Sequence, residues 1–182
     1  MTPVSQRAGC LVALVACLLF LLAATVAASD GAVRMPHVRT PSARIRELIH
    51  EGCRRSPTFR SIFETVEQSD LIVYVETTAA APPGVDAWLQ YEGESPVNRF
   101  LRIFVKVPTS DEALIVLVGH ELQHATEVAA ASDVRNQRSL EALYRRAGDW
   151  SGAGWDSAAA RWASKIVRDE LRSAVQPASG RR

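Results

Sequence analysis

The stretch LVGHELQHA, residues 117–125, places two histidines four positions apart, His120 and His124, with Glu121 beside the first. On an α-helix, residues four apart share a face, offset by roughly 40° and about 6 Å along the axis, so both imidazoles can reach one metal ion. Glu121 points elsewhere on the helix but stays near the metal, where it can deprotonate a coordinated water instead of binding the ion. Zinc lowers the pKa of such a water to about 7. The stretch therefore predicts a helix that carries a zinc site, with Glu121 as its catalytic base.

The flanking sequence favours a helix here. No proline occurs between Thr109 and Pro177, and residues 113–118 are mostly apolar, which gives the helix a face to bury. A polar residue at 109–111 can cap its start, and we expect it to run to about Ala130. Two other interpretations stay open: a surface helix that carries two histidines by chance, and a zinc site without catalysis.

The first 28 residues are typical of an export signal. One positive charge, Arg7, precedes an almost wholly apolar run over residues 9–28, which ends in small residues suited to cleavage after Ala28. We therefore expect an exported protein, periplasmic or secreted, whose mature chain begins at about Ser29. An uncleaved membrane anchor is one alternative, because the run approaches the roughly 20 residues that span a bilayer. Lipidation at Cys17, which follows Leu-Val-Ala, is another.

Composition narrows the class of protein further. Cys10 and Cys17 leave with the signal, so Cys53 has no partner for an internal disulfide. Loss of Arg7 takes the formal net charge from +1 to 0. This balance predicts no nucleic-acid partner and no membrane contact other than an uncleaved signal segment. The length of the mature chain suits one domain with one core.

Periodicity and breakers predict the order of the elements. We expect a linker over residues 29–41, then two helices separated at Ser56-Pro57, then three strands, then the helix of the HExxH motif. A further helix over 139–147, a flexible glycine-containing loop over 148–154 and a last helix capped by Asp156 should follow. Residues 176–182 should form a disordered tail. The expected strands are 71–76, 85–91 and 100–107.

This order resembles the zincin metallopeptidases, and Gly-His-Glu-Leu-Gln-His-Ala-x-Glu after a signal resembles small exported bacterial proteins with zincin-like features. The specific match covers about ten residues around the motif. The resemblance implies an α+β fold over residues 42–175, with N-terminal helices, a small and mostly antiparallel sheet, the HExxH helix and C-terminal helices. In zincins the last strand before this helix borders the cleft and pairs with extended substrate. By position that strand would be 100–107; the alternative is that a loop covers it.

A catalytic zinc needs three protein ligands and an open position. The third histidine of the metzincins is absent, so we expect a carboxylate. Glu141 is the first candidate, because a helix-turn-helix return would bring it beside the motif at a separation resembling the shorter gluzincins. Glu127 is the rival third ligand, on the same face as the histidines. It lies about 10 Å along the axis from His120, so its alternative role is to orient His124. Asp133 and Asp149 remain possible if their loops fold inward.

The expected chemistry is hydrolysis of a peptide or protein substrate, with zinc polarising the scissile carbonyl and Glu121 passing a proton to the leaving amine. Tyr144 can donate to the developing oxyanion or simply pack in the core. Trp150 and Trp155 are candidates for a lid over the cleft. The competing function is a non-catalytic zincin-like protein, with a structural zinc or a binding role in the cell envelope.

Overall fold

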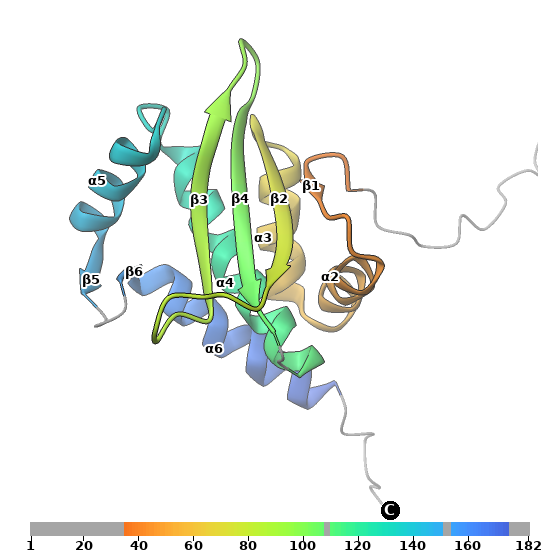
Figure 1. The fold of residues 1–182 in the computed structure, drawn as a ribbon. Helices are drawn as coiled ribbons and strands as arrows, with labels where there is room; N and C mark the ends of the chain where they lie inside the picture. The colour runs from red at the N-terminus through yellow and green to blue at the C-terminus, as the bar shows by residue number, and fades with distance from the viewer. Residues whose placement is uncertain (1–34, 108–109, 151–153, 175–182) are drawn as a thin grey trace, which may run out of the picture. The chain divides into compact units, whose positions relative to one another are not determined.

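The computed structural model describes residues 35–107, 110–150 and 154–174, which form an α+β fold (Figure 1). The expected signal segment, its cleavage site and the expected tail lie outside these ranges. Within them, no helix is long and apolar enough to cross a membrane. The elements in order are β1 (Val38–Arg39), α2 (Ala43–Arg55), α3 (Pro57–Glu67), β2 (Leu71–Thr78), β3 (Ala87–Glu94), β4 (Arg99–Lys106), α4 (Asp111–Ala130), α5 (Gln137–Ala147), β5 (Gly148–Trp150), β6 (Trp155–Ser157) and α6 (Ala158–Ser173).

The main sheet has the strand order β1-β2-β4-β3. Strand β2 runs parallel to both β1 and β4, and only β3 is antiparallel to its neighbour, β4. The expectation of a mostly antiparallel sheet is therefore wrong, and the sheet is mixed. The sheet is mixed because β4, and not β3, pairs with β2. The β3–β4 hairpin places β4 parallel to β2 and leaves β3 at the edge. Val38 and Arg39, expected in the linker, form β1.

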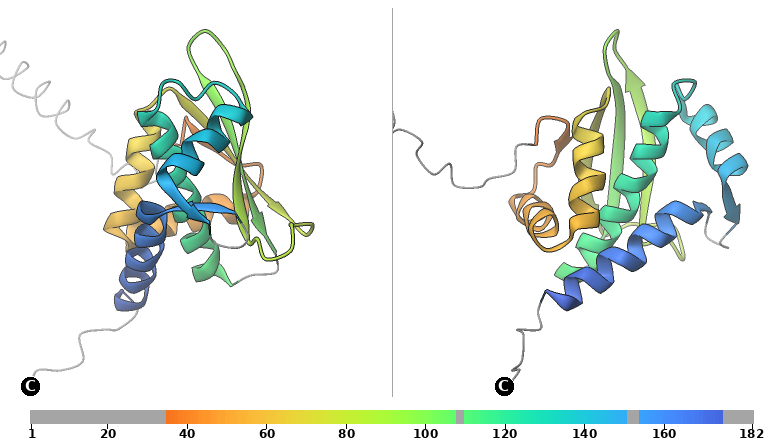
Figure 2. Two further views of the ribbon diagram at one scale, coloured as in Figure 1. Left: turned by 90° about the vertical axis from the view of Figure 1, so that its left-hand side faces the viewer. Right: turned by 180° about the vertical axis from the view of Figure 1, so that it is seen from behind.

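The helices gather on one face of this sheet, as Figure 2 shows from the side and from behind. Helix α4 contacts β2, β3 and β4, and α3 and α6 pack against α4. Because α4 lies between the sheet and these helices, its buried side chains point in several directions, from Leu114 to Val128. Phe59 of α3 packs against Gly52 and Gly119, where an added Cβ would come within 3.0 Å of its ring.

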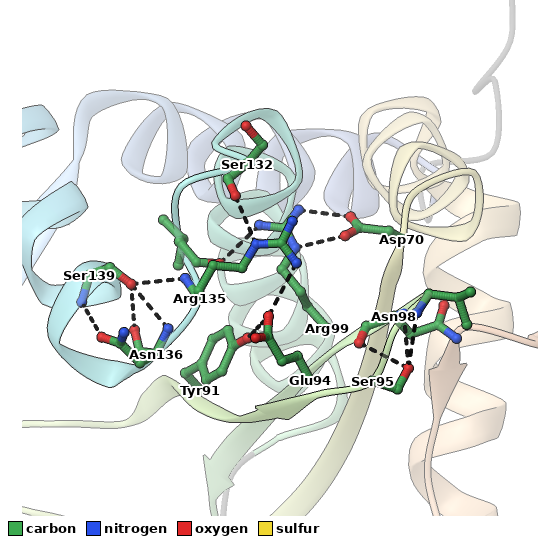
Figure 3. Close-up of polar contacts among 12 residues, drawn as sticks. Asp70, Tyr91, Glu94, Ser95, Asn98, Arg99, Ser132, Arg135, Asn136 and Ser139 are labelled. Carbon is green, nitrogen blue, oxygen red and sulfur yellow. Dashed lines mark hydrogen bonds and ion pairs between the residues drawn. The ribbon is translucent and has the colours of Figure 1, made fainter.

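A buried arginine fixes the end of α4 that follows the HExxH motif (Figure 3). Arg99 of β4 is 2% exposed, and its guanidinium donates to the carbonyls of Val128 and Ala131 at 3.0 and 2.8 Å. The same group binds both carboxylate oxygens of Asp70, at 2.8 and 2.7 Å. Both carbonyls also accept backbone amides, from Ala131 and Val134, so Arg99 adds a charged donor from the sheet to the end of the helix and holds α4 in register with β4.

The stretch expected to be a flexible loop, 148–154, lies partly in a short hairpin. Strands β5 and β6 pair antiparallel, with Gly148 opposite Ser157 and Trp150 opposite Trp155. Gly148 is required here, because an added Cβ would lie 2.6 Å from the carbonyl oxygen of Asp156. The hairpin therefore brings residue 156 back toward α4.

Candidate metal centre

Three side chains from two distant parts of the chain converge beside α4. The Nε2 atoms of His120 and His124 lie 3.3 and 3.4 Å from the same atom, Oδ1 of Asp156. Their candidate ligand atoms all lie within 4.8 Å of one another. Two imidazoles and one carboxylate in this arrangement can hold a metal ion.

The other ring nitrogen of each histidine is already bound. Nδ1 of His120 lies 2.8 Å from Oγ of Ser164 on α6, and Nδ1 of His124 lies 3.0 Å from Oε2 of Glu127. When each Nδ1–H donates to these oxygens, each Nε2 presents its lone pair toward Asp156. Metal-binding histidines commonly have this outer hydrogen bond, because it fixes both the tautomer and the ring orientation.

Asp156 presents one oxygen without a hydrogen bond. Its Oδ1 is buried and accepts no hydrogen bond from the residues that the structure describes. Arg161 holds the rest of the residue: it donates to the backbone oxygen at 2.8 Å and lies 4.0 Å from Oδ2. This oxygen faces the Nε2 atoms of both imidazoles, and a cation among the three atoms would satisfy it. The donor set therefore fits a divalent metal.

Glu127 lies where an orienting residue for His124 belongs. Its second oxygen, Oε1, accepts a hydrogen bond of 2.5 Å from Ser157, the N-cap of α6. Ser157 follows Asp156 directly, so a single carboxylate connects the His124 ring to the backbone that carries Asp156. This contact couples the orientation of His124 to the position of Asp156.

Glu121 is the buried carboxylate of the motif. It is 4% exposed and has no hydrogen bond to another described residue. Burial raises the pKa of Glu121 to about 7, and the nearby His124 lowers it only in part. A carboxylate whose pKa lies near neutrality can both take and return a proton there.

The two histidines differ in their pKa. Burial opposes the charge of His124, but the carboxylates of Asp156 and Glu127 beside its two ring nitrogens outweigh it and raise the pKa of His124 to about 9. Burial and the neighbouring His124 charge lower the pKa of His120. Burial opposes ionisation of Asp156, yet the two histidines hold the pKa of its carboxyl below the usual value. In the metal-free protein a proton therefore occupies His124, and a metal ion would replace it.

The carboxylates predicted as third ligand lie elsewhere among the described residues. Glu141 lines the same cavity but is exposed on α5, where Gln137 donates to it at 3.2 Å. Asp133 pairs with Arg146 at 3.7 Å, and Asp149 pairs with Arg161 at 2.8 Å. None of the three belongs to the group that converges with the histidines.

Asp156 was expected only as the cap of the last helix. The cap is Ser157, whose side chain accepts a hydrogen bond from the Ala160 amide. Asp and Ser both cap helices well, so adjacent Asp156 and Ser157 leave one of them for another role. The presence of two possible caps could have suggested that Asp156 has another role. Asp156 lies 32 residues after His124, however, and such a separation does not predict that the two side chains meet.

A cavity of about 700 Å³ opens onto the metal-binding group. The edge strand β3 and the preceding loop form one wall, from Pro82 to Leu89, and α4 and α5 form another. Tyr144 lines it with its ring edge-on to His124, at 4.7 Å between centroids. Trp155 lines it from β6, and Trp150 contacts Trp155 at 5.6 Å. The volume suits a small molecule or a few residues of a peptide.

No family model, curated protein or solved structure matches the chain.

Proposed function

We propose that the chain is an exported zinc-dependent hydrolase of the zincin type, acting on peptide bonds. The observation that supports this most directly is the convergence of His120, His124 and the buried Oδ1 of Asp156, with buried Glu121 next to the first histidine. The export assignment rests on the signal-like sequence of residues 1–28.

Zinc is the metal that this donor set favours. Two imidazole nitrogens and one carboxylate oxygen are a ligand set found in catalytic zinc sites, which keep a fourth position open. An all-oxygen set would favour magnesium or calcium instead. The cavity beside the three ligands provides the space that an open position requires.

The residues around the cavity supply the remaining steps. Zinc, when bound, would polarise the scissile carbonyl and make water a stronger acid. Glu121, buried beside the first histidine, accepts the proton of the attacking water and delivers it to the leaving amine. Burial holds the pKa of Tyr144 well above its usual value, so its hydroxyl stays protonated and can donate to the oxyanion.

The strand that borders the cleft is β3. The expected strand, 100–107, corresponds to β4, whose backbone is paired on both sides by β2 and β3. On β3, the Tyr91 amide points away from β4 and donates to Gln137 at 3.0 Å. Ala87 and Leu89 have the same parity, so their amides and carbonyls also face outward, toward the cavity they line. An extended substrate would add to this edge through its main chain.

Replacement of Glu121 by Gln tests the proposal. Gln cannot accept the proton, so we expect hydrolysis of a broad peptide library to fall by about 10²–10⁴-fold while zinc content is unchanged. Glu47→Gln, on the exposed face of α2, is the matched control and should retain activity. The hydrolase proposal fails if the zinc-loaded wild type shows no chelator-sensitive cleavage.

The non-catalytic alternative predicts a different result. The three ligands join α4 to the β5–β6 hairpin, so a bound metal would also tie these elements together. If that is its whole role, chelation lowers the melting temperature, no peptide is cleaved, and Glu121→Gln has no effect on either property.

A further inference from the structure

The cavity carries negative charge that the metal would not neutralise. Its lining includes four carboxylates and no Lys or Arg among the described residues, although 21 of the 182 residues of the chain are basic. A dication would balance Asp156 and Glu121. Asp86 already lies 3.8 Å from Nζ of Lys106. Glu141 forms no ion pair with a described residue, so its charge remains for a ligand.

Aromatic rings lie in the same cavity as these carboxylates. Tyr144 and Trp155 line it, whereas Trp88, also at its edge, stacks its ring on Phe104 at 4.8 Å between centroids. Aromatic faces attract cations through the ring quadrupole, and the attraction adds to that of a nearby carboxylate. Glu121, nine-tenths buried and without a hydrogen-bond partner among described residues, independently indicates that the cavity receives a ligand.

Glu141 is held at a fixed place relative to the strand that would bind substrate. Gln137 donates through Nε2 to Glu141 at 3.2 Å, and its Oε1 accepts the amide of Tyr91 at 3.0 Å. One side chain therefore connects the Glu141 carboxylate to β3, two residues from the outward-facing groups of Leu89. A substrate strand paired with β3 would pass Glu141 in a defined register.

We propose that the cleft selects substrates that carry a positive charge at one position, and that Glu141 determines this selectivity. The ligand group is an ammonium or guanidinium, from a Lys or Arg side chain or from a free amino terminus. A general negative potential in the cavity would favour basic residues at every position of the substrate. Because Gln137 fixes Glu141 relative to β3, we expect the preference for a positive charge at one substrate position only. That the bound group belongs to a substrate rests on the proposed hydrolase function.

The test measures peptide binding to the zinc-loaded Glu121→Gln protein, which separates binding from turnover. Acetylated and amidated peptides carry one Arg moved along the sequence, each compared with a peptide that has neutral, isosteric citrulline at that position. Binding is followed by the fluorescence of the cavity tryptophans. We expect at least about fivefold tighter binding for Arg at a single position, weakening as salt is raised. A second series with free amino termini distinguishes a terminal amine from a side chain.

Glu141→Gln, combined with Glu121→Gln, should reduce the Arg-to-citrulline ratio to about one, and Glu47→Gln in the same background should leave the ratio as it was. Zinc content and melting temperature establish that each variant is folded. Equal binding of the Arg and citrulline peptides in both series, or a ratio that survives Glu141→Gln, overturns the inference. Selective binding without cleavage by the wild type would contradict the hydrolase function alone. Cleavage that ignores charge would contradict this inference alone.

Discussion

At the residue scale, each of the three candidate ligands is held by a neighbouring side chain on the side away from the proposed metal position. Ser164 holds His120, Glu127 holds His124, and Arg161 holds the backbone of Asp156. The free atoms of the three residues are consequently those that face one another. Because the side chains are oriented before any ion binds, metal binding requires little reorganisation.

Removal of one outer contact should weaken the site without unfolding the domain. Glu127→Ala takes away the acceptor for His124 Nδ1 and the partner of Ser157, so we expect zinc affinity to fall by about 10–100-fold. Competition with a chromogenic chelator measures the dissociation constant. Glu127→Gln, which retains one oxygen, should have an intermediate affinity, and Glu47→Ala should match the wild type. An unchanged affinity in Glu127→Ala would show that the contact does not orient the ligand.

The motif residues could be predicted from the sequence because helical geometry alone brings His120 and His124 together. The third group could not. Asp156 reaches them through a hairpin whose pairing depends on a close approach of two backbones at Gly148, and no local pattern records that approach. The prediction of Glu141 rests on the expectation that α5 returns beside α4, and α5 does line the cavity next to His124. The Glu141 side chain nevertheless lines the cavity instead of joining the histidines.

At the element scale, the β5–β6 hairpin is the part that completes the site. It is short, and its base is set by the contact between Gly148 and the backbone of Asp156. Ser157 then begins α6, whose Ser164 binds His120. Displacement of this hairpin would therefore move one ligand directly and disturb the contacts of the others.

Gly148→Ala should lower metal affinity although residue 148 does not touch the metal. The added Cβ would lie 2.6 Å from the Asp156 carbonyl oxygen, which is backbone and must shift. We expect zinc to bind at least about tenfold more weakly, as measured by titration calorimetry. Displacement of Asp156 should weaken binding about as much as loss of a hydrogen bond that orients a ligand. The matched control is Gly154→Ala in the same segment, where an added Cβ meets nothing within 4 Å. Equal losses in both variants would rule out the backbone contact as the cause.

The sequence predicted most helix and strand positions but not the arrangement of the sheet. Local periodicity places the strands, whereas the parallel pairing of β2 with β4 depends on contacts far apart in the chain. The consequence for function is that the cleft is bordered by β3, one strand earlier than expected.

At the scale of the whole molecule, the metal-free domain should have an unusual dependence on pH. The pKa of His124 is raised from 6.5 to about 9, so folding favours its protonated form. Such a group stabilises the fold fully below the unfolded pKa, and this contribution is lost as pH rises through the folded pKa. The raised pKa of Glu121 also makes the free energy of unfolding fall as pH rises, mainly between pH 4.5 and 7. The lowered pKa of His120 makes the free energy of unfolding rise with pH, and this rise ends near pH 6.5.

Between pH 7 and 9, we therefore expect the free energy of unfolding of the chelator-treated protein to decrease by about 2 kcal/mol, measured by urea denaturation. Zinc affinity should increase over the same window, because the metal competes with the proton on His124. His124→Gln should abolish the decrease. Stability that is constant or rising with pH in the metal-free wild type would contradict the assigned surroundings of His124.

The most direct test of the metal centre is the zinc content of the purified protein, determined by elemental mass spectrometry on the wild type, Asp156→Ala and Glu141→Ala. The two substitutions remove carboxylates from the same cavity, but only Asp156 lies within 3.3 and 3.4 Å of the histidine nitrogens. We predict about one zinc per chain in the wild type and in Glu141→Ala, and loss of zinc in Asp156→Ala. Zinc retained in Asp156→Ala and lost in Glu141→Ala would contradict the site described here.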